Sequence, residues 1–142
     1  MKLKEAVILY KVLGEAKVGV LEESDIAIII KVRKNLRSAV EEYEAFLKDC
    51  QEKFKPENWD KTQEKIAQWQ QEGEKTTLTI EERTEINKAI IEYQNKINAV
   101  INVELEKVID VTVEKLSEDA AVKLIKHNDW SNNKLDELSP IL

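Results

Sequence analysis

The chain has 142 residues, of which 42% are hydrophobic and 35% charged, with a formal net charge of −6. Its Lys and Arg residues are scattered among acidic residues, which argues against specific nucleic-acid binding because phosphate binding depends on clustered cations. No stretch approaches the ~20 apolar residues of a membrane span, and an acidic residue near the start excludes a secretory signal. We therefore expect a soluble, cytoplasmic protein with no membrane contact.

Composition and spacing predict a mainly α fold. Three Gly and two Pro leave few residues for turns. Two stretches carry apolar residues at alternating three- and four-residue steps, which places each set along one helix face, as in the seam of a coiled coil. We expect a long antiparallel helical hairpin with short flanking helices and one minor β element. The two seams are Ile29, Val32, Leu36, Ala39, Tyr43, Phe46 and Cys50, and then Ile86, Ile90, Tyr93, Ile97 and Val100.

The first part of the chain should form two helices. Residues 3–14 have apolar residues at helical spacing, with Gly14 as the C-terminal cap; a strand over 6–10 is the alternative. Ser24 is expected to cap the first seam helix, because its side chain can accept a free backbone N–H. That helix should end near Phe54, since the residue before a following proline avoids helical angles.

The middle of the chain should form the tip of the hairpin, near residues 55–78. A short helix is expected near 60–72, followed by a loop. Thr79 and Glu82 have the spacing of a capping box, so the second seam helix should begin there and reach about Val103.

After the second seam helix the pattern changes to a two-residue period. In residues 107–114, β-branched apolar residues alternate with polar ones, which predicts a strand. A lone strand needs a partner for its backbone groups. The candidates are residues 17–21 and the same strand of a second copy, and the second pairing would make a symmetric homodimer.

The C-terminal part should hold one further helix and a tail. Ser117 is expected to cap a helix that reaches about Lys126. We expect residues 1–127 to form a single helical domain. Residues 128–142 form either a docked tail or an arm that folds on a partner.

The sequence contains no local motif that predicts catalysis or metal binding, such as a glycine-rich phosphate loop or a Cys-x-x-Cys pair. Cys50 lies on the first seam, where it acts as a small apolar residue. His127 has no acidic partner that the sequence reveals. We therefore expect no enzyme activity, no cofactor and no metal.

Six residues are candidates for binding a protein partner. Trp residues in such positions are more often core or hairpin-tip anchors, but Trp69 and Trp130 lie in segments with few other apolar residues, which keeps interface anchoring open for both. Three Asn residues share a face of the second seam helix, as a solvated strip or as a hydrogen-bonding surface for a partner helix. Val111 is a candidate because it lies in the predicted strand, whose edge has no certain pairing partner within the chain. The six residues are Trp69, Asn95, Asn98, Asn102, Val111 and Trp130.

A short apolar helix over residues 7–13 precedes a charged run from Glu41 to Phe54. Much later, Glu92 opens a run that continues through the alternating segment to Asp119. This order of features resembles short bacteriophage or prophage-encoded proteins of unknown function. The resemblance implies a part in virion assembly, in the host cytoplasm or in the virion, and it carries over no catalytic residue.

Two hypotheses for function follow. The first is a non-enzymatic structural or interaction protein, such as a phage scaffold that binds itself or another phage or host protein. The alternative is an acidic regulatory module that sequesters a protein partner as a monomer. The mass of the protein in solution separates them.

Overall fold

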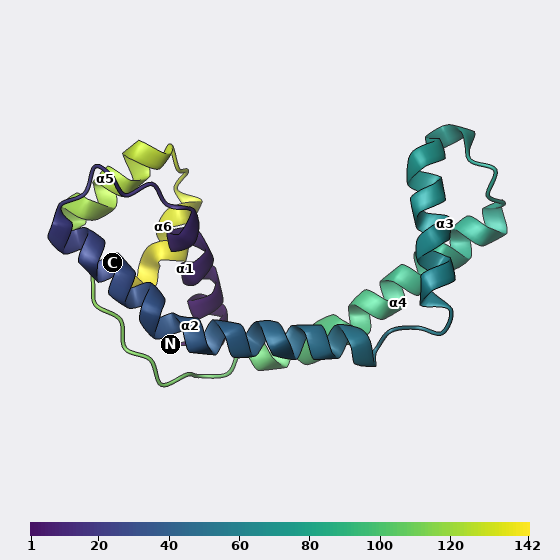
Figure 1. Ribbon diagram of the computed structural model, residues 1–142, viewed down its shortest axis with the longest axis horizontal. Coiled ribbons are helices and arrows are strands. Elements are labelled where there is room, and N and C mark those ends of the chain that lie inside the picture. The colour runs from purple at the N-terminus through teal and green to yellow at the C-terminus, as the bar shows by residue number, and fades with distance from the viewer. The chain divides into compact units, whose positions relative to one another are not determined.

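The computed structural model describes residues 1–142 and is 75% helical, with six α-helices and no sheet. The predicted mainly α fold is confirmed (Figure 1). Two 3-10 turns, η1 (Gly73–Lys75) and η2 (Ser139–Ile141), complete the regular structure. The α-helices are α1 (Leu3–Glu15), α2 (Glu23–Lys53), α3 (Trp59–Glu72), α4 (Ile80–Leu105), α5 (Glu118–Asn128) and α6 (Asn133–Leu138).

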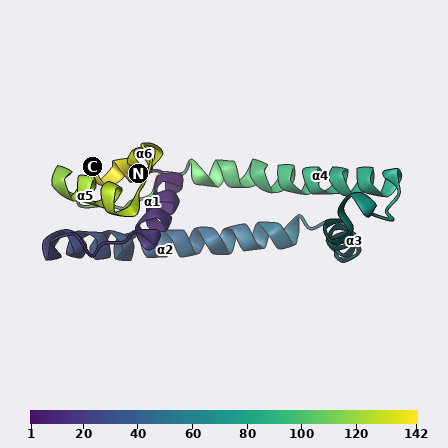
Figure 2. The same ribbon diagram turned by 90° about the horizontal axis from the view of Figure 1, so that it is seen from above.

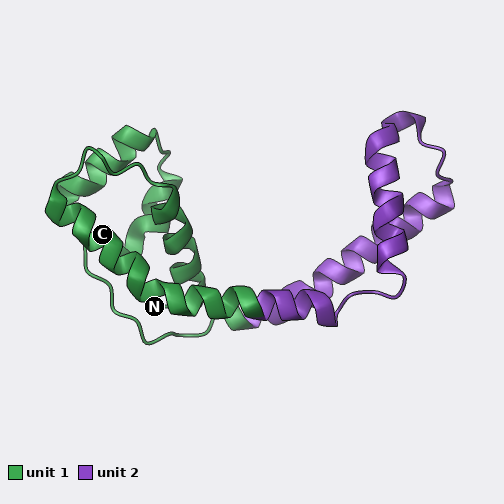
Figure 3. Ribbon diagram, in the orientation of Figure 1, with its two compact units in different colours: residues 1–45, 104–142 green, residues 46–103 purple.

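The chain divides into two compact units (Figure 3). Unit 1 comprises Met1–Ala45 and Glu104–Leu142, and unit 2 comprises Phe46–Val103. We expected a single domain ending at residue 127, and the division does not fall there. The C-terminal residues belong to unit 1, where α6 packs on α1 and where Ile141 is fully buried. The segment 128–142 is therefore docked.

Unit 1 has a continuous apolar core where α1, the start of α2, α5 and the C-terminal turns meet. Leu9, Leu36 and Leu124 are fully buried there, one from each of the three helices. Ala6 and Ala120 are also fully buried. The core residues of α1 lie at steps of three and four along the sequence, so one face of the helix supplies them all.

The strand predicted over residues 107–114 does not form. The segment runs through unit 1 as an extended chain without regular secondary structure (Figure 1) and makes one isolated antiparallel bridge, between Lys2 and Val108. Two hydrogen bonds tie it to the N-terminus, from Leu3 N–H to the Lys107 carbonyl at 2.8 Å and from Ile109 N–H to the Met1 carbonyl at 2.9 Å. The N-terminal residues enter α1 directly, which leaves too short a partner for a ladder.

The predicted partner of that strand also has a different structure. Residues 17–21 form a turn, in which Leu21 N–H donates to the Val18 carbonyl at 3.0 Å. The alternating pattern nevertheless has a structural cause, because Ile109, Val111 and Val113 pack against the core of unit 1. The alternating pattern therefore indicates an extended segment with one apolar side that packs on the core, and not a strand of a sheet.

Two predicted helix starts are confirmed by their hydrogen bonds. Glu82 N–H donates to Thr79 Oγ1 at 3.1 Å, and Thr79 N–H donates back to Glu82 Oε1 at 3.3 Å, which is the predicted capping box. Ser117 Oγ accepts from Ala120 N–H at 3.1 Å at the start of α5.

Two other predicted caps are wrong. α2 begins at Glu23, so Ser24 lies inside its first turn, because the Glu22 carbonyl already accepts the first helical hydrogen bonds. α1 continues through Gly14 to Glu15. The missing side chain of Gly14 instead leaves room for Arg33, whose Nη2 would lie 3.0 Å from a Cβ at that position.

Unit 2 holds α3, most of α4 and the end of α2. Within it, the Tyr93 hydroxyl donates to the Gln51 carbonyl at 2.6 Å, so α4 contacts the end of α2. The short helix predicted at 60–72 is confirmed as α3. The coiled-coil-like hairpin along the full length of α2 and α4 stays a prediction.

Candidate functional site: an apolar groove between α3 and α4

α3 is anchored to α4 at its first residue. Trp59 is buried, and its ring lies 4.8 Å from the ring of Tyr93, measured between centroids, with the two planes tilted by 43°. Such tilted aromatic pairs add to the free energy gained by burial. From this anchor α3 departs steeply from α4, so that Figure 2 shows α3 nearly end-on and α4 from the side.

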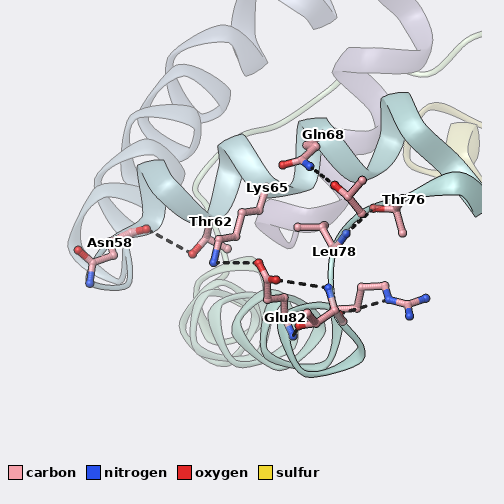
Figure 4. Close-up of polar contacts among 10 residues, drawn as sticks. Asn58, Thr62, Lys65, Gln68, Thr76, Leu78 and Glu82 are labelled. Carbon is pink, nitrogen blue, oxygen red and sulfur yellow. Dashed lines mark hydrogen bonds and ion pairs between the residues drawn. The ribbon is translucent and has the colours of Figure 1, made fainter.

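Further along, polar contacts tie α3 to the first turn of α4 and to the loop that precedes it (Figure 4). Lys65 Nζ lies 3.5 Å from Glu82 Oε2, and Gln68 Nε2 donates to Thr77 Oγ1 at 3.0 Å. The backbone N–H of Thr79 lowers the pKa of Glu82, which keeps this carboxylate ionised for its capping bond and for Lys65. Together these contacts fix α3 on α4 through exposed groups as well as through the buried Trp59.

A hollow of about 290 Å³ lies between the two helices. Its volume is at the lower edge of the ~300–1,000 Å³ of ligand pockets. Gly73 lines it just after α3, with a φ of 59°, in a backbone region that favours glycine. We call this hollow the α3–α4 groove, and it is lined by Ile66, Trp69, Gln70, Gly73, Ile86, Asn87 and Ile90.

The side chains of the α3–α4 groove offer apolar contact and amide hydrogen bonds. Ile86 is buried at its base, whereas Ile66, Trp69 and Ile90 are half-buried. Gln70 and Asn87 are exposed, and each carries both a donor and an acceptor. None of the lining residues is ionisable, so the groove suits an uncharged apolar group whose flanking backbone can bond to the amides.

Of the six residues predicted to bind a partner, Trp69 lines this groove. Asn95, Asn98 and Asn102 are exposed further along α4 and do not line it. The other two belong to unit 1. They are half-buried against its core: Val111 from the extended segment and Trp130 after α5.

Sequence reasoning missed most of the groove. Ile86 and Ile90 were assigned to a seam facing the other long helix, whereas both also face α3. Ile66 and Trp69 lie three residues apart, so they share one face of the helix predicted near 60–72. No local sequence pattern predicts that α3 packs on α4, because Trp59 contacts Tyr93 through tertiary packing alone.

Other chemistry-bearing residues do not assemble into a site. His127 is exposed and borders a shallow surface hollow with Lys123 and Lys126. Cys50 is buried as a free thiol. No group of three or more His, Cys, Asp or Glu residues is arranged to hold a metal ion. None of the helices has the length and apolar character to cross a membrane.

Comparisons with known proteins do not assign the chain to a family. It matches no family model, no curated protein and no solved structure.

Proposed function

We propose that the protein is a non-enzymatic interaction protein that binds an apolar segment of a partner protein in the α3–α4 groove. The observation that carries the proposal is Trp69, a half-buried Trp in an apolar hollow. Trp residues at the centre of interfaces often dominate binding energy. The neutral amides of Gln70 and Asn87 stand at the groove, where they can bond to the backbone that flanks an apolar side chain.

The surface of α4 supports this proposal. Three of its large apolar residues are exposed: Ile80 at 74%, Ile91 at 56% and Val103 at 76% of their full surface. Isolated exposed apolar residues are normal on a protein surface. Here they occur on the helix that forms one wall of the groove, and so they offer a partner apolar contact along α4.

We place the role in virion assembly, as a scaffold that binds a second copy or another phage or host protein. This part of the proposal rests on the resemblance of the chain to short phage proteins. The alternative is an acidic regulatory module that sequesters its partner as a monomer, which the net charge of −6 favours by attracting a basic partner.

The groove is tested with Trp69→Ala and Ile90→Ala, compared with Gln71→Ala, which changes an exposed residue of α3 that does not line the groove. Sedimentation of the purified protein over a range of concentrations measures self-association. Affinity purification from the native host, quantified against wild type, measures binding to other proteins.

We expect an association of the wild type that both groove variants lose and that Gln71→Ala retains. Loss of self-association favours the scaffold, and loss of a heterologous partner by a monomer favours the regulatory module. If the wild type forms no association that depends on Trp69, the proposed function is wrong.

A further inference from the structure

Unit 1 contains a second hollow, about 310 Å³ in volume, where the end of α1 and the loop after it meet the first turns of α2. This hollow lies outside the groove on which the proposed function rests. Its walls are apolar on the side of α1 and at the start of α2, and two arginines stand further along α2. We call it the α1–α2 pocket; its main lining residues are Leu13, Val18, Ile26, Ile29, Arg33 and Arg37.

The α1–α2 pocket is apolar at one end and cationic at the other. Ile26, Arg33 and Arg37 lie seven and eleven residues apart in sequence, so they share one face of α2. At 1.5 Å per residue, about 10 Å of helix separates Ile26 from Arg33. A molecule that lies along this face of α2 would therefore contact apolar side chains near Ile26 and positive charge near Arg33 and Arg37.

The two arginines have hydrogen-bonding capacity that the protein does not use. The Arg33 guanidinium carbon lies over the Tyr10 ring, 4.3 Å from its centroid, in a cation–π contact. Arg33 Nε is buried and has no hydrogen-bond partner. Neither Arg33 nor Arg37 forms an ion pair, although the chain has 28 acidic residues against 22 Lys and Arg.

Arg33 Nε is enclosed by protein, so the terminal N–H groups of Arg33 and Arg37 are the donors left for a ligand in the pocket. The in-plane N–H groups of arginine match the two oxygens of a carboxylate or the oxygens of a phosphate. The pocket offers no hydroxyl or amide side chain for the third oxygen and second charge of a phosphate. Its donor set therefore fits a carboxylate better.

We propose that the α1–α2 pocket binds a small amphiphilic monocarboxylate, with the carboxylate between Arg33 and Arg37 and a short apolar chain against Ile26, Ile29 and Val18. The volume, close to the lower limit for ligand pockets, suits a single short chain. The two charges and the apolar walls recognise the two ends of such a molecule, so neither end alone binds as well.

Sodium octanoate is the probe, titrated into the full-length protein by calorimetry. Acetate carries the head group alone, 1-octanol carries the tail without charge, and octyl phosphate exchanges the head group. Arg37→Gln removes a charge from an exposed position and leaves the packing of Arg33 on Tyr10 intact. Lys34→Gln is the matched control, because it removes the same charge from a neighbouring exposed position that does not line the pocket.

We expect octanoate to bind more tightly than the three comparison ligands. Arg37→Gln should weaken octanoate binding by roughly tenfold or more, the effect of losing a charge-assisted hydrogen bond, and Lys34→Gln should not. Arg33→Lys keeps the charge but loses the planar fork, so it should also weaken binding, with circular dichroism confirming that the variant is folded.

Four results would overturn the proposal. Equal binding of octanoate and 1-octanol would mean that the pocket selects apolar chains only. Equal affinities of Arg37→Gln and Lys34→Gln would mean that the arginines do not hold the head group. Tighter binding of octyl phosphate, or no octanoate binding at millimolar concentration, would exclude a carboxylate site.

Discussion

Glu106 pairs with two lysines in unit 1. Its two carboxylate oxygens each lie 2.6 Å from an ammonium group, Oε2 from Lys2 Nζ and Oε1 from Lys4 Nζ. Hydrogen bonds from Lys2 and then Lys4 lower the pKa of Glu106 to about 2. The three side chains are about half exposed, so solvent weakens the pairs, but they join the segment after α4 to the start of α1.

Replacing Glu106 with Gln should lower the melting temperature near neutral pH but not near pH 2. A carboxyl group whose pKa falls on folding stabilises the folded state above its unfolded pKa, and that contribution is lost as pH falls through the folded pKa. The difference between Glu106→Gln and wild type should therefore shrink between about pH 4.5 and pH 2. Thermal melting at a series of pH values measures it. Glu64→Gln, at an exposed carboxylate without an ion pair, should show no such trend.

Thr79→Ala should destabilise unit 2 by about 1 kcal/mol, because it removes the side-chain acceptor for Glu82 N–H. Thr84→Ala is the matched control. Thr84 Oγ1 bonds only to the Ile80 carbonyl inside α4, where alanine is the better helix former. Urea denaturation compares the two variants. Equal destabilisation by both would show that the capping box contributes no stability.

At the scale of elements, the extended segment after α4 depends on a few backbone bonds. Ile109 N–H donates to the Met1 carbonyl, whereas Val111 N–H makes no backbone hydrogen bond. Ile109→Pro should therefore destabilise the protein by about 0.5–1.5 kcal/mol more than Val111→Pro, since proline removes the donor. Both sites are half-buried in extended chain, which tolerates proline. Chemical denaturation measures the difference. A larger loss for Val111→Pro would point to a strand ladder at that residue.

Local patterns predicted the helices well because local interactions define them. Apolar spacing placed α1, α3 and α4 within a residue or two of their observed bounds, and Thr79 and Ser117 cap through side chains that lie three residues from their partners. Ser24 and Gly14 were mistaken for caps because either residue type is also tolerated inside a helix. Nothing local distinguishes those two environments.

The candidate sites depend on contacts between distant residues, and sequence patterns carry little information about these. Trp69 was recognised by its isolation among polar residues. Arg33 gave no signal, because its buried Nε and its contact with Tyr10 exist only once α1 lies against α2. The extended segment shows the same limit: alternation identified its apolar side, and only the packing of unit 1 decided that no second strand would pair with it.

At the scale of the whole molecule, the two units should differ in local stability. Unit 1 contains a continuous core of fourteen buried residues. Buried residues in unit 2 are fewer, namely Cys50, Trp59, Leu78, Ile86, Ile97 and Ile101. Regions with fewer buried apolar contacts open at lower free energy.

We therefore expect backbone amides of α3 and of the first turns of α4 to exchange hydrogen faster than those of α1 and α5. Hydrogen exchange followed by mass spectrometry measures this for each peptide. Leu36→Ala, in the core of unit 1, should destabilise that unit by about 2–5 kcal/mol. The difference in exchange rate between the helices of the two units should therefore become smaller in this variant. Uniform protection of all helices would show that the two units unfold as one.

The division of the chain also determines the order in which the protein can fold during synthesis. Unit 2 is one continuous stretch, so a growing chain can complete it before the last part is translated. Unit 1 must wait, because Met1 and Leu3 bond to residues just after α4 and Leu116 N–H donates to the Ile141 carbonyl. Leu9 and Leu36 are fully buried in a core that Leu124, Leu138 and Ile141 complete. These side chains of α1 and α2 therefore keep part of their apolar surface uncovered until the last residues leave the ribosome, and they are the part of the nascent chain that a chaperone would have to shield.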